Sequence, residues 1–308
     1  MKNIPNNLDC FKISQENPEP QLDPDYFIIE REVEIKEYIK NVKNLKEILI
    51  TIKKLKENRE DKNVIEKYFK KLFDNFNEFS NCSELGCFVN ACDTTRDLIR
   101  KDFESFKRIT NFFIQKRIID DKAPENWIQA VIDNNASRKK GKLGEDKLIK
   151  ILAGFGYKPV KSWEEFDKNK KSVASFSNSV FSFKEAKLRL QIGLKTKNQE
   201  KMLDLLIRRN NKIFILEAKH LNTGGGEQNK QIDELIKILE LKEKEKNVFY
   251  ISFLDGTYSN KLIIGEIPKR SRKLSKQRKQ IEGYLNKKDF KNYWINTAGF
   301  INLFKNLN

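Results

Sequence analysis

The chain has 308 residues, with 61 Lys and Arg against 44 Asp and Glu, which gives a formal net charge of +17 at pH 7. A surplus of this size exceeds what solubility requires and indicates a polyanionic partner, either nucleic acid or an anionic membrane. The sequence contains no run of about 18 apolar residues that would span a membrane, and its first 20 residues lack the apolar core of a signal peptide. We therefore expect a cytoplasmic protein that binds nucleic acid and no membrane.

The first 135 residues divide into two predicted parts. Residues 1–25 contain four prolines and many Asn and Gln, a composition typical of an extended arm. Residues 26–135 place apolar side chains three and four positions apart in long stretches such as VEIKEYIKNVKNLKEILITIKKL, which predicts an all-helical domain. Recognition of a ligand and dimer contacts are the two functions that we consider for this domain.

Four cysteines raise the question of a metal site. Cys82, Cys87 and Cys92 are evenly spaced, but CxxxxCxxxxC is not a usual zinc spacing, and the only histidine, His220, lies far away in sequence. With Cys10, they number too few to indicate a disulfide framework in a cytoplasmic chain of this length. We favour small buried side chains in a helical region over metal ligands.

Residues 136–308 change in pattern and predict an α/β domain. A basic loop precedes a helix near 143–153, and strand-like apolar runs follow in KMLDLLI, KIFILEAK and NVFYISFLD. The segment EQNKQIDELIKILELKEKEK, between the last two runs, is typical of a helix. Strand, strand, helix and strand in this order predict a mixed central sheet flanked by helices.

The first two of these strands form a predicted hairpin that brings acidic residues together. If Asn210 and Asn211 make the two-residue turn, opposed residues have numbers that sum to 421. Asp204 then lies directly across from Glu217, with Cβ atoms about 5 Å apart. Lys219 lies two residues beyond Glu217 and therefore points to the same face.

Two carboxylates and a lysine on one face indicate a metal site. Carboxylates this close repel each other unless a proton or a cation lies between them. Mg²⁺ suits them because it takes oxygen ligands and retains water, and a neighbouring lysine can orient or deprotonate that water. The alternative is a surface hairpin with a solvated salt bridge. It explains Glu217 and Lys219 but leaves the matching position of Asp204 unexplained.

Asp204, twelve intervening residues and Glu217-Ala218-Lys219 resemble the catalytic motif of the PD-(D/E)xK nuclease superfamily, which includes many type II restriction endonucleases. The resemblance covers roughly residues 140–255, and Met202-Leu203 replace the proline often found before the Asp. It implies a restriction-endonuclease-like fold. Its implied roles are metal binding by Asp204, Glu217 and the Ala218 backbone carbonyl, and positioning of the attacking water by Lys219.

Many members of that superfamily add an acidic residue from a helix before the sheet, and Glu145 in GKLGEDKLIKIL matches this position, with Asp146 adjacent. A second ExK, Glu185-Ala186-Lys187, follows a long polar stretch after Asp167 without hairpin character. We expect this second copy to be an exposed helix or strand edge and not a site.

Several residues around the motif are candidates for DNA contact. Three consecutive glycines, 224–226, precede a predicted helix N-terminus without the ending of a nucleotide-binding P-loop. Two basic clusters, at 138–142 and 269–279, are typical of phosphate-binding or solvated surfaces. The candidate DNA-binding residues are Arg138, Lys139, Lys140, His220, Gln228, Gln231, Lys269, Arg270, Arg272 and Lys273.

The function predicted from sequence is that of a type II restriction endonuclease. Such an enzyme would use Mg²⁺ to hydrolyse phosphodiester bonds of double-stranded DNA at a short specific sequence, and the resemblance implies a homodimer. One alternative is a repair, recombination or transposition nuclease of the same superfamily that recognises DNA structure. Another is a non-catalytic DNA-binding protein on a decayed nuclease fold. RNA is a further possible substrate that nothing in the sequence favours.

Overall fold

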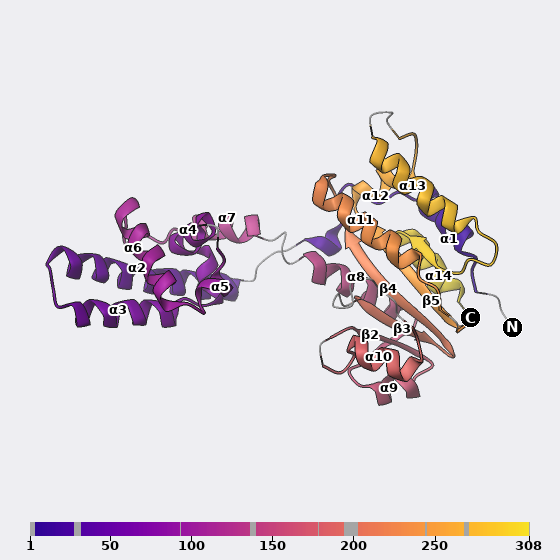
Figure 1. The fold of residues 1–308 in the computed structure, drawn as a ribbon, viewed down its shortest axis with the longest axis horizontal. Coiled ribbons are helices and arrows are strands. Elements are labelled where there is room, and N and C mark those ends of the chain that lie inside the picture. Colours follow the sequence, from indigo (N-terminus) through magenta and orange to yellow (C-terminus); the bar gives the residue numbers. More distant parts are fainter. Residues whose placement is uncertain are drawn as a thin grey trace. The chain divides into compact units, whose positions relative to one another are not determined.

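The computed structural model describes residues 4–27, 32–92, 94–135, 140–177, 179–193, 203–243, 245–267 and 271–307. In this part, the chain contains fourteen α-helices, two short 3-10 helices and six strands in one mixed sheet (Figure 1). It divides into two compact units. One comprises residues 28–138, here called the helical unit, and the other comprises residues 1–27 together with 139–308, here called the α/β unit. The predicted α/β class with helices towards the N-terminus is thus confirmed.

The helical unit has its own core, built from the apolar stripes of its helices. Leu45, Ile52, Phe69 and Phe106 are fully buried in it, and Lys46 is buried where it pairs with carboxylates of the same unit. Its elements are α2 (Glu32–Glu57), α3 (Lys62–Asn75), η2 (Glu78–Cys82), α4 (Glu84–Ala91), α5 (Arg96–Ile99), α6 (Phe103–Lys116) and α7 (Glu125–Asn135).

The cysteines of this unit are free thiols within its apolar clusters. Cys82 is buried, and Cys87 and Cys92 are half-buried. In the α4 region and the rest of the described chain, no cysteine belongs to a group of side chains that could hold a metal. The structure thus agrees with the interpretation as small buried side chains.

The α/β unit contains the sheet, in which the strand order follows the chain. β1 pairs with β2, β4 with β5 and β5 with β6 in parallel, whereas β3 is antiparallel to both neighbours. Every residue of β5 is buried, as expected for a central parallel strand covered on both faces. The strands are β1 (Lys158–Pro159), β2 (Lys171–Ser175), β3 (Leu205–Arg209), β4 (Lys212–His220), β5 (Val248–Asp255) and β6 (Tyr293–Ile295).

Helices cover both faces of this sheet (Figure 1). On one face, Leu148 and Phe304 pack in one cluster with Phe214 of β4. On the other face, Phe166 and Ile238 pack with Ile215 of the same strand. The first face is covered by α1 (Asn7–Glu16), α8 (Lys140–Gly154) and α14 (Thr297–Asn306), and the second by α9 (Trp163–Lys168), α10 (Phe183–Leu190) and α11 (Gly226–Leu239), beside α12 (Thr257–Ile263) and α13 (Arg272–Leu285).

The prediction that residues 1–25 form an extended arm is wrong. Helix α1 occupies residues 7–16, with the Asn6 side chain accepting a hydrogen bond from the N–H of Leu8. The four prolines all fall outside this helix and so do not interrupt it. The helix packs so closely on α14 that a Cβ added to Gly299 would lie 2.2 Å from Oγ of Ser14. Residues 1–27 therefore belong to the α/β unit.

The predicted hairpin is confirmed in its turn and its register. Asn210 has φ 56°, in the left-handed region that Asn tolerates in tight turns. Paired residues run from Arg209 and Lys212 to Leu205 and Leu216, and every pair sums to 421. The strands overlap the predicted runs but their ends differ: β3 starts only at Leu205, one residue after Asp204, and continues past its run to Arg209, and β4 ends at His220.

Candidate metal-binding active site

The acidic pair lies where β4 extends beyond β3. The N–H of Asp204 donates to the carbonyl of Leu216 at 3.0 Å, next to the last registered pair of β3 and β4, Leu205 and Leu216. Beyond that point no strand of the described residues pairs with β4 on this side, and Oδ2 of Asp204 accepts the N–H of Ala218 at 2.6 Å. The Asp204 side chain thus closes the strand edge, which holds its carboxylate against the last residues of β4.

Glu217 and Lys219 complete the group on the same face of the sheet. Alternation along β4 places them with Ile213 and Ile215, on the face that α11 covers, as expected from the sequence. Glu217 is only 2% exposed, and Nζ of Lys219 lies 2.5 Å from its Oε1. The three predicted catalytic residues are therefore brought together by local strand geometry.

The electrostatics of the pair favour a cation. Burial and then the negative charge of Glu217 raise the pKa of Asp204 to about 7, against the opposing effects of the Ala218 N–H and Lys219. With such a pKa, ionisation of Asp204 in the folded protein costs free energy at neutral pH. A divalent cation between the two side chains would remove this cost.

The backbone of Ala218 is suitably directed for a third ligand. In a β-strand the N–H and the C=O of one residue point to the same side, as in the pairs that exchange both bonds. Since the N–H of Ala218 points to Asp204, its carbonyl points to the same edge of β4. The donor set that the structure offers here is carboxylate and carbonyl oxygen, which is the chemistry that Mg²⁺ prefers.

Glu145 on α8 is the third acidic residue of this region. Burial raises the pKa of Glu145, against the Ser175 side chain, and the charge of Glu217 raises it further. The charge of Glu145 in turn contributes to the raised pKa of Asp204. The adjacent Asp146 is exposed. The structure therefore favours Glu145 over Asp146. The carboxylates of Glu145, Asp204 and Glu217 do not, however, form a group with all ligand atoms within 4.8 Å of one another in the described chain.

The second ExK motif does not form such a site. Glu185 and Lys187 lie on helix α10, where Ala186 is buried and Glu185 pairs with Arg189 one turn further along. A helix does not place residues two apart on one face. The prediction offered an exposed helix or a strand edge for this copy, and the structure shows a helix.

The glycine-rich loop joins β4 to α11, and its glycines are exposed. A Cβ on Gly224 would lie 2.4 Å from the Tyr258 ring, so a larger residue here would have to displace that side chain. Helix α11 begins at Gly226, and its N-cap Gly225 provides no side-chain hydrogen bond. Gln228 folds back over the loop, since its Oε1 would lie 2.6 Å from a Cβ on Gly225. Gln231 is half-buried in the next turn.

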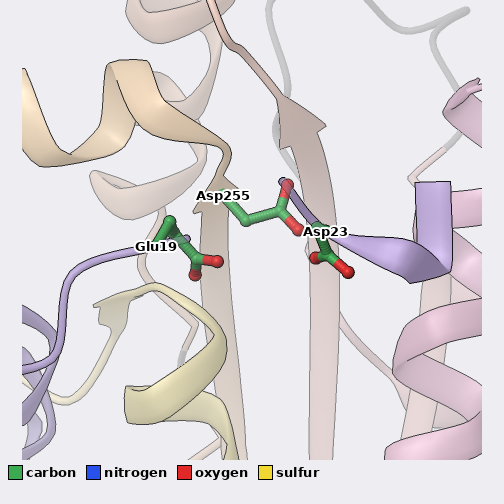
Figure 2. Close-up of side chains that lie close together, drawn as sticks. All are labelled: Glu19, Asp23 and Asp255. Atoms are coloured by element: carbon green, nitrogen blue, oxygen red, sulfur yellow. The ribbon is translucent and has the colours of Figure 1, made fainter. Parts of the chain in front are cut away.

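A second group of carboxylates was not predicted from the sequence. Glu19, Asp23 and Asp255 present oxygens that all lie within 4.8 Å of one another, the one such group among the described residues, and this buried acidic cluster could hold a metal ion (Figure 2). In the structure, however, the Lys147 ammonium already lies between two of them. It donates to Oδ2 of Asp23 at 2.7 Å and to Oδ2 of Asp255 at 2.8 Å.

Three side chains meet at the carboxylate of Asp255, which is fully buried at the end of β5. The Lys147 ammonium and the Tyr26 hydroxyl both donate to Oδ2 at 2.8 Å, and Nδ1 of His220 lies 2.9 Å from Oδ1. Asp23 is joined to the group through Lys147. We call Asp23, Tyr26, Lys147, His220 and Asp255 the Asp255 cluster. Only the acidic end of the apolar run NVFYISFLD hints at it in the sequence.

This cluster accounts for His220, which we considered as a DNA contact. Its Nε2 lies 3.1 Å from Nδ2 of Asn222, its ring stacks on Tyr26 with centroids 3.6 Å apart, and its side chain is 9% exposed. Both ring nitrogens thus have protein partners in this structure. His220 faces the side of the sheet opposite to Lys219, because neighbours on a strand alternate.

The predicted basic contacts are only partly visible. Arg138, Lys139, Lys269 and Arg270 lie outside the described residues, as does the side chain of Lys140. Arg272 and Lys273 begin α13 and line a groove of about 610 Å³ between α13 and α11. Lys237 and Lys276 line it as well, and the buried Gln277 lies in it.

The positive charge of the chain is unevenly divided between the units. Residues 28–138 contain 22 Lys and Arg against 20 Asp and Glu, so only +2 of the total +17 belongs to the helical unit and +15 to the α/β unit. An attraction to polyanions is therefore a property of the unit that contains the candidate site.

Within the described residues, no helix has the length and apolar character needed to cross a bilayer. The chain matches no protein-family model, no curated protein and no solved structure with which it was compared.

Proposed function

We propose that the protein is a Mg²⁺-dependent endonuclease of the PD-(D/E)xK type that cleaves double-stranded DNA. The observation that supports this most is the arrangement of Asp204, Glu217 and Lys219 on one face at the end of β4, with the pKa of Asp204 raised by burial and by its acidic neighbour. A structural hairpin has no use for two neighbouring carboxylates, one buried and one half-buried, that are costly to ionise together. A metal site does.

In this proposal each residue has a separate task. Asp204, Glu217 and the carbonyl of Ala218 would hold Mg²⁺, with Glu145 as an outer acidic partner. When bound, the ion supplies Lewis acidity towards the phosphate oxygen and activates water. The Lys219 ammonium, now against Glu217, orients the attacking water and compensates charge on the phosphate. The carboxylate of Glu217 keeps the Lys219 amine in place.

The positive α/β unit supports the choice of nucleic acid as substrate. Backbone phosphates would be bound by its surplus of +15, and the groove between α11 and α13 is a candidate contact, because four of its lining residues are Lys or Arg. The nearly neutral helical unit is better suited to contacts other than phosphate binding, such as base recognition or contacts with a second copy.

Within this class we propose a type II restriction endonuclease that acts as a homodimer, since cutting both strands requires two active sites. The direct test is incubation of the protein with phage DNA and Mg²⁺, followed by sequencing of the fragment ends. Fragments that end at one short sequence support site-specific restriction. Preferential cutting of branched or flapped DNA would instead favour a repair, recombination or transposition nuclease. An absence of cutting with Mg²⁺ or Mn²⁺ would leave a DNA-binding protein and refute the proposal.

A further inference from the structure

The active-site end of β4 is held from its opposite face by the Asp255 cluster. His220 follows Lys219 directly and points away from the site, towards α8 and α14. Its Nδ1 is 2.9 Å from Oδ1 of Asp255 on the neighbouring strand, with which it is also paired in register. The last residue of β4 is thus tied to β5 by its side chain as well as by its backbone.

The same carboxylate also ties down the helix that carries Glu145. Lys147, two residues further along α8, is 3% exposed and donates to Asp255, to Asp23 and to Oγ1 of Thr297 at 2.8 Å. Because a buried ammonium needs all three of these hydrogen bonds, its acceptors are held in one arrangement around it. Asp255 therefore connects β4, which carries Glu217 and Lys219, with α8, which carries Glu145.

The N-terminal segment completes the cluster. Tyr26 donates to Oδ2 of Asp255, and its ring stacks on the His220 ring with centroids 3.6 Å apart. Nζ of Lys147 lies over the Tyr26 ring, 5.3 Å from its centroid. Asp23 accepts from Lys147, and although burial raises the pKa of Asp23, the hydrogen bond from Lys147 brings it below its ordinary value. Glu19 and Asp23 thus lie beside Asp255 at the end of β5, far from it in sequence (Figure 2).

We infer that Tyr26 and His220 are positioning residues for the proposed cleavage, acting through the Asp255 cluster on Lys219 and Glu145. This inference rests on the proposed function. Neither side chain touches the proposed metal ligands or the reacting phosphate. Their effect is to fix the end of β4 so that the Lys219 amine and the carboxylates keep one geometry, as the residues behind metal ligands do in other enzymes.

The test compares three variants of the full chain. Tyr26→Phe removes only the hydroxyl that donates to Asp255, and His220→Phe keeps an aromatic ring on Tyr26 but removes both nitrogen contacts. Tyr250→Phe is the matched control, because it also removes a buried tyrosine–carboxylate hydrogen bond of the α/β unit, the 2.6 Å bond to Glu243. For each variant one measures single-turnover cleavage of DNA with Mg²⁺, the Kd for DNA in Ca²⁺, the melting temperature and hydrogen exchange at residues 217–220.

We expect His220→Phe to slow cleavage by about 10-fold or more, the size seen when partners behind metal ligands are removed, and Tyr26→Phe to slow it less. The Kd for DNA should remain unchanged, and exchange at 217–220 should increase. Tyr250→Phe should lower the melting temperature while its cleavage rate and that exchange stay at the wild-type level.

Wild-type rates in both cluster variants would overturn the inference and leave the proposed function intact. Equal losses of rate in all three variants, in proportion to their melting temperatures, would also overturn it, because the cluster would then be only structural. A wild-type protein that cuts no DNA would refute the proposed function itself, and the positioning role would fall with it.

Discussion

Replacement of Asp204 by Asn should stabilise the metal-free protein while it abolishes cleavage. In the folded state the pKa of Asp204 is raised to about 7 by burial and by Glu217, from an ordinary value of 3.8. Asn retains an oxygen that can accept the N–H of Ala218, now 2.6 Å from Oδ2, but removes the charge. The variant thus keeps the strand-edge hydrogen bond and loses the carboxylate repulsion.

The sign and the size follow from the two pKa values. Well below its ordinary pKa of 3.8 the side chain is neutral in both folded and unfolded chains, so that it contributes no penalty. Between 3.8 and about 7 the unfolded chain loses its proton first, and the penalty of the folded state grows with pH. Above pH 7 it is complete. The difference between the two values corresponds to an upper limit of about 4 kcal/mol, at about 1.4 kcal/mol per pKa unit.

Thermal unfolding in EDTA at pH 5 and pH 8 measures this effect. At pH 8 the Asp204→Asn variant should melt several degrees above the wild type, since each kcal/mol shifts Tm by about 2–4 °C in a domain of this size. At pH 5 the difference should be much smaller. Addition of Mg²⁺ should raise Tm of the wild type but not of the variant, because a ligand stabilises only the state that binds it.

Asp146→Asn is the matched control, since it removes an exposed carboxylate from the neighbouring helix α8. It should change Tm little at either pH. A variant at Asp204 that is less stable than the wild type at pH 8, or equally shifted at both pH values, would refute the assignment of a repelling carboxylate pair.

Lys219→Ala should abolish cleavage and leave the Kd for DNA within a few-fold of the wild type, as measured by cleavage and filter-binding assays, because the amine acts at the water and not in binding; near-wild-type cutting would remove it from the site. Changing the three Lys and Arg of α13 that line the groove to Ala should weaken DNA binding and reduce the salt slope by about one for each lost phosphate contact; an unchanged slope would exclude the groove. Gly299→Ala should lower the free energy of unfolding by about 1–3 kcal/mol through overpacking against Ser14, measured in urea. Gly283→Ala on α13, where no atom lies within 4 Å of the new methyl, should not lower it.

The sequence by itself determined the hairpin that carries the proposed site, and did so through local geometry. A tight Asn-Asn turn and the alternation of side chains along two adjacent strands place Asp204, Glu217 and Lys219 on one face, whatever the rest of the fold does. The α/β class and the helical character of residues 26–135 were accessible for the same reason, since apolar periodicity is a property of neighbouring residues.

Other features were decided only by tertiary structure. The segment before residue 27 was expected to be an extended arm because of its prolines, yet its helix is stabilised by α14 at the opposite end of the chain. Asp23, Lys147 and Asp255 are separated by more than a hundred residues from one another, and no local pattern relates them. Their association depends on how the N-terminal segment and α8 pack over the ends of the parallel strands. In the folded chain, Lys147 and its two carboxylates are removed from water, so that each charge needs the others as partners.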